Sequence, residues 1–172
     1  MSRELPQITL QQRQMMMTVI WLALIMGVVT FGMIVTFIGL KEEPGKGLPV
    51  ITYLGMGLAA LMLVLRMIIP NMIARNQFTQ AMQEAREEGN QDEKQMLGTF
   101  YQIFMVRMII GLALLEGAAM INLVAVMVEN QKLAFIPVAI LLLVMIASMP
   151  TKSKLDGWIR NQMENYNLEH QN

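Results

Sequence analysis

Glu116 is the residue of this chain whose side chain, an acid in the middle of an apolar segment, could bind or transfer a proton or bind a cation. It lies in the apolar segment 103–128, 13 residues from the start and 12 from the end. If the segment crosses a bilayer, this carboxylate lies near the midplane, where an ionised acid facing lipid costs at least about 2.5 kcal/mol. We therefore expect Glu116 to face other helices, to be protonated, or to accept hydrogen bonds.

The sequence leaves three roles open for Glu116. It could be a protonated hydrogen-bonding anchor, a proton or ion site, or a contact for a substrate. Matching its depth to the other apolar segments predicts Thr30 and the stretch 55–60 as neighbours. Any partner must come from another helix, and Thr30 is the one predicted to form a hydrogen bond.

Asn122 and four small residues are the other candidates at similar depth. Asn122 is predicted to form a hydrogen-bonding link between helices, because buried amides in membrane helices usually do so. Small residues recur at four-residue spacing at Ala113 and Gly117, and again at Gly55 and Ala59. This spacing allows helices to approach closely in lipid, so we expect both pairs at helix contacts.

The composition excludes several classes of chemistry. The chain has no cysteine, which excludes disulfides, thiolate metal sites and cysteine nucleophiles. The single histidine, His170, lies in a polar tail that supplies no catalytic or metal-binding partner. The formal net charge of zero does not favour binding to nucleic acid. We expect no enzymatic activity, no catalytic residue, no metal and no cofactor, and we interpret the 19 methionines as packing residues.

Four long apolar segments separate the charged residues: 18–40, 49–69, 103–128 and 133–149. A helix of about 20 apolar residues, rising 1.5 Å per residue, covers the ~30 Å hydrocarbon layer of a bilayer. The fourth segment has 17 residues and is at the lower limit for crossing. The sequence predicts an all-α integral membrane protein, a single domain over 1–172 with four transmembrane helices in an antiparallel bundle.

Lysine and arginine are distributed unevenly between the ends of these segments. Of the 13 basic residues, only Lys41, Lys46 and Lys132 lie in the two short turns. The other ten lie in the two terminal regions, in the long middle connection, or at its edges, as Arg66 and Arg107 do. Cytoplasmic flanks retain basic residues during insertion, and long basic side chains at helix ends extend toward the headgroups. We therefore expect both termini and the middle connection on the cytoplasmic side of the inner membrane.

The middle connection, 70–102, is rich in helix-forming residues and has Gly89-Asn90 near its centre. We interpret it as a cytoplasmic helical hairpin that extends the second and third membrane helices. Its two arms are predicted to pair through apolar residues: Phe78, Met82 and Ala85 against Met96, Leu97 and Phe100.

The tail, 150–172, places four residues at helical spacing: Leu155, Trp158, Ile159 and Gln162. Lys152, Lys154 and Arg160 flank them. This pattern is typical of a short helix lying on the inner membrane surface. A partly ordered polar tail is the alternative that the sequence leaves open.

The stretch 112–119, LALLEGAA, precedes a polar turn, an apolar helix and Met149-Pro-Thr-Lys. This combination resembles uncharacterised four-helix membrane proteins of planctomycete-type bacteria over the last two helices and part of the connection, and it implies no activity. The stretch is also similar to the ion-carrying helix of rotary ATP synthase proteolipid subunits, which holds a mid-helix acid among small residues. The proteolipid helix that precedes it carries a dense glycine repeat, whereas here the preceding helix has only Gly55 and Gly57, so Glu116 alone is carried over.

These patterns favour a structural, interaction or assembly role. No nucleophile with a base, no metal cluster and no paired acids occur at one depth. The alternative function is a proton- or cation-coupled transporter in which Glu116 is alternately loaded and unloaded. The expected partners are the lipid bilayer and either a second copy of the chain or another membrane protein.

Overall fold

A computed structural model describes residues 10–39, 48–87 and 93–170 of the chain, and these residues form helices and short connections without any strand. The elements in chain order are α1 (Leu10–Ile34), the π-helical turn η1 (Val35–Gly39), α2 (Val50–Glu87), α3 (Glu93–Glu129), the 3-10 turn η2 (Lys132–Ala134), α4 (Phe135–Ala147) and α5 (Lys152–His170). The prediction of an all-α chain is confirmed.

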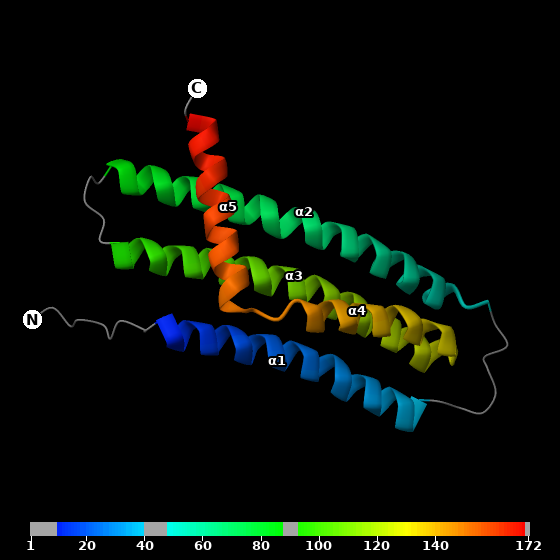
Figure 1. Ribbon diagram of the computed structural model, residues 1–172. Helices are drawn as coiled ribbons and strands as arrows, with labels where there is room; N and C mark the ends of the chain where they lie inside the picture. Colours follow the sequence, from blue (N-terminus) through cyan, green and yellow to red (C-terminus); the bar gives the residue numbers. More distant parts are fainter. Residues whose placement is uncertain (1–9, 40–47, 88–92, 171–172) are drawn as a thin grey trace, which may run out of the picture.

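The helix α3 is the central element of the bundle. It packs against α1, α2 and α4, and α2 lies beside it along much of its length (Figure 1). The apolar window of α3 is 50% buried, whereas the windows of α1 and α2 are each 17% buried. The colours in Figure 1 show α1 and α3 running in one direction and α2 and α4 in the other.

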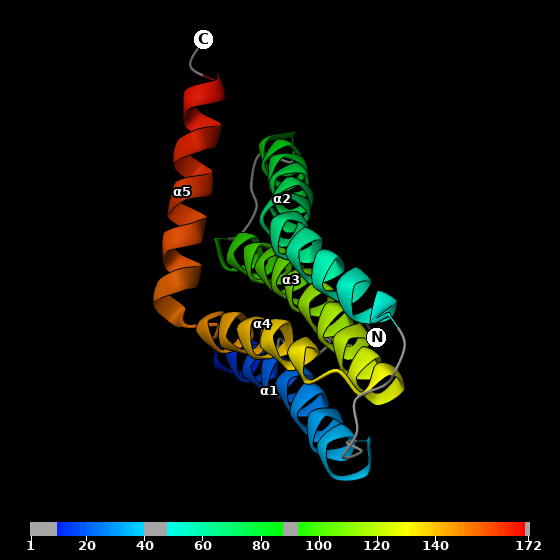
Figure 2. The same cartoon turned by 90° about the vertical axis from the view of Figure 1, so that its right-hand side faces the viewer.

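Three helical stretches are long and apolar enough to cross a membrane: Gln14–Ile38, Val50–Glu84 and Gly98–Glu129. The fourth predicted segment forms a shorter helix, since α4 has 13 residues and spans about 20 Å. It reaches the required length only when joined to α5, and the two are bent by 79° (Figure 2). The described residues therefore contain three to four candidate spans.

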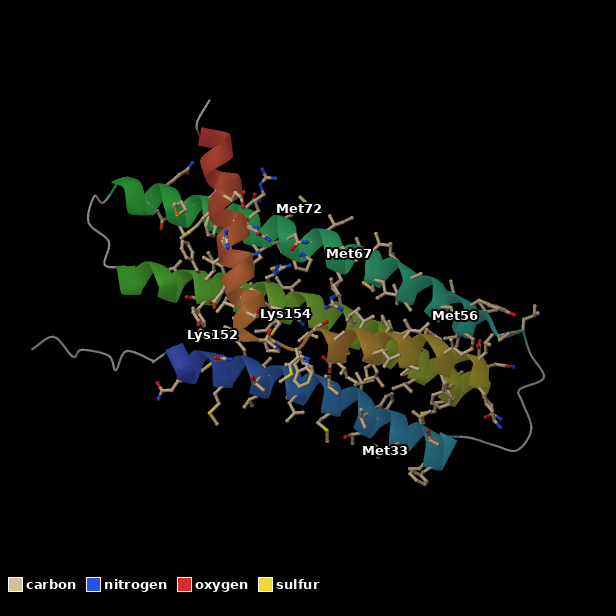
Figure 3. The ribbon with its side chains drawn as sticks, in the orientation of Figure 1. Met33, Met56, Met67, Met72, Lys152 and Lys154 are labelled. Atoms are coloured by element: carbon tan, nitrogen blue, oxygen red, sulfur yellow. The ribbon has the colours of Figure 1, made fainter. Side chains whose placement is uncertain are left out.

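The sides of these helices that face away from the bundle are apolar. Phe37 is 86% exposed, and Met67 and Leu143 are 75% and 66% exposed. Figure 3 shows the methionines of the outer faces, with Met33 on α1 and Met67 and Met72 on α2. Large contiguous apolar surfaces are uncommon on soluble monomers and mark a membrane or a protein interface.

Part of the predicted pairing between α2 and α3 lies among the described residues, and there the structure agrees with it. The rings of Phe78 and Phe100 stack with their centroids 4.7 Å apart. Pro70 lies inside α2 without ending the helix. The Gly89-Asn90 turn lies outside the described residues, as do the side chains of Ala85, Met96 and Leu97.

The tail forms the helix that one of its two predictions expects, from Lys152 to His170. The apolar face that was expected to lie on the membrane is covered by protein, because Leu155, Trp158 and Ile159 are buried in a cluster with aromatic residues of α2 and α3. The ring centroid of Trp158 lies 6.1 Å from that of Phe78 and 5.7 Å from that of Phe104.

A carboxylate from α3 caps the first turn of α2. The Glu129 side chain accepts hydrogen bonds from the backbone N–H of Ile51 at 2.6 Å and of Thr52 at 2.8 Å. The first N–H groups of a helix have no partner within the helix, and the helix dipole favours negative charge at that end. Glu129 therefore joins the end of α3 to the start of α2.

Replacing Glu129 by alanine removes this cap, and we expect the free energy of unfolding to fall by about 1 kcal/mol. Thermal unfolding of the purified protein in a neutral detergent measures the change. The matched control is Glu84→Ala, since Glu84 is an exposed acid near the end of α2 that caps no helix start. Equal melting temperatures for Glu129→Ala and the control would contradict the capping role.

Candidate functional site

Glu116 points from α3 toward α1. Its Oε1 atom lies 3.2 Å from the place that a Cβ atom on Gly27 would occupy, and the methyl group of Met120 lies 3.9 Å from the same place. The absence of a side chain at Gly27 therefore leaves the room that the carboxylate fills. Nothing in the sequence pattern singles out Gly27, because its importance depends on how α1 is rotated against α3.

The predicted hydrogen bond between Glu116 and Thr30 is absent from the described part of the chain. Thr30 is exposed, whereas Glu116 is half-buried beside Gly27. Three residues along a helix correspond to a rotation of about 300°, which offsets Thr30 from Gly27 by about 60° around α1, and at that offset Thr30 is exposed. The structure thus brings Glu116 to the first helix, as expected, but to a different residue.

Asn122 is a buried link between α3 and α2. Its side chain is fully buried, and its Nδ2 donates hydrogen bonds to the carbonyl oxygen of Gly55 at 3.0 Å and of Ala118 at 2.8 Å. A Cβ atom on Gly55 would lie only 2.8 Å from the Asn122 Oδ1 atom. Asn122 and Gly55 thus lie in the close helix contact that their residue types predict.

The two predicted pairs of small residues differ in their placement. Gly55 and Ala59 are buried, with Ala59 3% exposed, in the contact of α2 with α3. Ala113 and Gly117 are exposed, and a Cβ atom on Gly117 would have nothing within 4 Å. Among the residues that the structure describes, the second pair therefore makes no helix contact, because the face of α3 that carries it points outward.

A second polar centre lies where α2, α3, α4 and α5 meet, in a cavity of about 560 Å³. Three basic side chains line it, Arg66 from α2, Arg107 from α3 and Lys154 from α5, and no acidic residue does. We call it the cationic cavity. Its full lining is Arg66, Pro70, Phe104, Arg107, Met108, Gly111, Leu112, Ala147, Ser148, Lys154, Gly157, Trp158 and Asn161.

Hydrogen bonds hold each of the three cations at the cavity. Arg66 Nη2 donates to Ser148 Oγ. Arg107 Nε donates to Asn71 Oδ1 at 2.8 Å. Lys154 Nζ donates to the carbonyl oxygens of Ala147 at 2.7 Å and Met149 at 3.2 Å, which satisfies groups at the end of α4.

Arg66 has one hydrogen-bond donor without a partner. The Nη1 atom of Arg66 is buried and has no hydrogen-bond partner. A buried guanidinium donor without a partner carries a large desolvation cost, so such atoms usually face a ligand, an ion or water.

The cationic cavity was missed by the sequence analysis, which places Arg66 and Arg107 at helix ends near the headgroups and Lys154 in the tail. The available signal is that Arg66 ends one apolar segment and Arg107 begins the next, so a hairpin brings them to the same level. The contribution of Lys154 depends on the bend between α4 and α5, which no local pattern specifies.

Comparison with known proteins adds no assignment to either centre. No family model, curated protein or solved structure matches the chain. Within the described residues, no group of three or more histidine, aspartate and glutamate side chains is placed to hold a metal ion.

Gly55→Ala should lower the free energy of unfolding by about 1–3 kcal/mol, because the added methyl group forces Asn122 away and breaks its hydrogen bond to α2. Gly57→Ala is the matched control, since a Cβ atom there meets nothing within 4 Å. Thermal unfolding in detergent measures both variants.

A double variant separates this clash from other effects of the substitution. In an Asn122→Ala background the Asn122 Oδ1 atom is gone, so Gly55→Ala should cost less than it does alone. An undiminished cost in that background would show that the contact between Gly55 and Asn122 is not what excludes a side chain.

Proposed function

We propose that the protein is an integral protein of the inner membrane that crosses it four times as an antiparallel helical bundle, with both termini in the cytoplasm. Three long apolar helices and the apolar outer surface support this placement. The short α4 completes the fourth crossing if it stands nearly upright, with Lys132 at one end and Lys152 and Lys154 at the other.

Within that membrane, the proposed role is structural, as an interaction or assembly component. The observation that carries this proposal is the surroundings of Glu116. The carboxylate packs against Gly27, and within the described residues it has no hydrogen bond and no ion pair. Acid-base chemistry needs a second group, and Asn122, the nearest polar candidate along α3, is already bonded to Gly55 and Ala118.

The proposed partners are the surrounding lipid and either a second copy of this chain or another membrane protein. The support is the surface of α1 and α2, whose apolar windows are each 17% buried. A helix that is apolar all round must meet lipid or other helices on its outer faces.

A proton- or cation-coupled transporter is the second candidate. It is favoured by the same carboxylate, because a half-buried acid without a hydrogen-bond partner is free to change its protonation state or its ligand. The two candidates differ in whether Glu116 is needed for transport or only for packing.

Flux measurements in liposomes distinguish the candidates. For a structural role, purified protein should move protons and monovalent cations no faster than empty vesicles. Glu116→Gln should leave this flux unchanged and should change the free energy of unfolding by no more than about 0.5 kcal/mol. Glu84→Gln is the matched control, because Glu84 is an exposed acid outside the predicted spans. Flux that is present in the wild type and the control but lost in Glu116→Gln would establish the transporter and refute the structural proposal.

A further inference from the structure

The cationic cavity carries a positive charge that no acidic side chain among its described lining residues neutralises. Arg66, Arg107 and Lys154 line the same cavity, and no acidic side chain lines it with them. Like charges gathered in a partly buried site repel one another more strongly than they do in water. An anion bound among them removes that repulsion.

We propose that the cationic cavity binds a phosphate group, supplied in the membrane by the headgroup of an anionic phospholipid. Arg66 lines the cavity and binds Ser148 through Nη2, and its buried Nη1 donor has no hydrogen-bond partner. Guanidinium groups bind phosphate oxygens through paired, charge-assisted hydrogen bonds. Arg66 and Arg107 therefore supply guanidinium donors for the phosphate, and Lys154 adds positive charge.

Arg107 is held in place before any ligand arrives. Its Nε donates to Asn71, and its guanidinium carbon lies 5.9 Å from the ring centroids of both Phe104 and Trp158. Cations over aromatic faces are stabilised by the ring quadrupole. A cation that is fixed in this way loses little conformational freedom when it binds an anion.

The lining and the position of the cavity favour a lipid as the source of the phosphate. Apolar residues, among them Met108 and Leu112, lie beside the cations, so a headgroup and the start of its acyl chains meet suitable surfaces. The volume of about 560 Å³ is within the range of small-molecule sites. Basic pockets between transmembrane helices on the cytoplasmic side bind acidic headgroups, and the proposed topology puts this cavity on that side. The choice of a lipid as the source of the phosphate rests on that proposed topology, whereas the anion site itself does not.

The test uses the full chain, purified in a neutral detergent, with three probes: phosphatidylglycerol, phosphatidylcholine and inorganic phosphate. Native mass spectrometry counts bound lipid, and titration gives the dissociation constants. We expect phosphatidylglycerol to bind at least about ten-fold more tightly than phosphatidylcholine, because only the former is anionic. Arg66→Gln and Arg107→Gln should each weaken its binding about ten-fold or more.

Lys152→Gln is the matched control. Lys152 lies two residues before Lys154 at the base of α5 (Figure 3), carries the same charge, is exposed and does not line the cavity. Lys154→Gln should weaken binding while Lys152→Gln leaves it unchanged. This pair keeps the test decisive if either arginine variant fails to fold, since both lysines lie in exposed positions on α5.

The possible outcomes show which source supplies the phosphate and whether the cavity binds an anion at all. Tight binding of inorganic phosphate that the same three variants weaken, with no preference for phosphatidylglycerol, would uphold the anion site and make a soluble phosphate its ligand. Equal binding of both lipids together with no effect of the cavity variants on any probe would overturn the proposal. Neither result bears on ion flux through Glu116, because binding is measured in detergent without a membrane potential or gradient.

Discussion

The apolar outer surface of the helices is the constraint on which the rest of the structure depends. In lipid no water is present to satisfy polar groups, so each of them must be paired inside the bundle or lie at its ends. Two of the described polar contacts illustrate this rule. Asn122 is paired with backbone carbonyls between α2 and α3, and Glu129 pairs with the start of α2. Arg66, Arg107 and Lys154 meet at the edge of the apolar segments that is farther from Glu129.

The helix α3 carries two polar centres with different requirements. Glu116 lies in the middle of the apolar segment 103–128 of α3, beside a glycine and without a hydrogen bond in the described residues, where a single group has little chemistry available to it. Arg107 lies near the start of that apolar segment, where α2, α4 and α5 supply further polar groups around a cavity. A ligand is therefore expected at the edge of the apolar segment of α3 rather than at the middle of that segment.

Much of the fold follows from the sequence because it depends on segment length and local periodicity. The helices, the pairing of Phe78 with Phe100 and the link formed by Asn122 are of this kind. The room for Glu116 at Gly27 depends instead on the rotation of one helix against another. The burial of Trp158 and the approach of Lys154 to the cavity depend on a bend of 79° between α4 and α5. Neither a rotation nor a bend of this kind leaves a local sequence pattern.

The membrane topology is the central claim, and cysteine labelling tests it most directly because the chain has no cysteine of its own. Single cysteines replace three exposed residues, Lys132, Glu84 and Glu164, and spheroplasts are treated with a membrane-impermeant maleimide. The four-crossing topology predicts labelling of Lys132→Cys in intact spheroplasts, and of Glu84→Cys and Glu164→Cys only after lysis. Labelling of Glu164→Cys in intact spheroplasts would contradict the topology, since Glu164 would then lie on the outer side with Lys132.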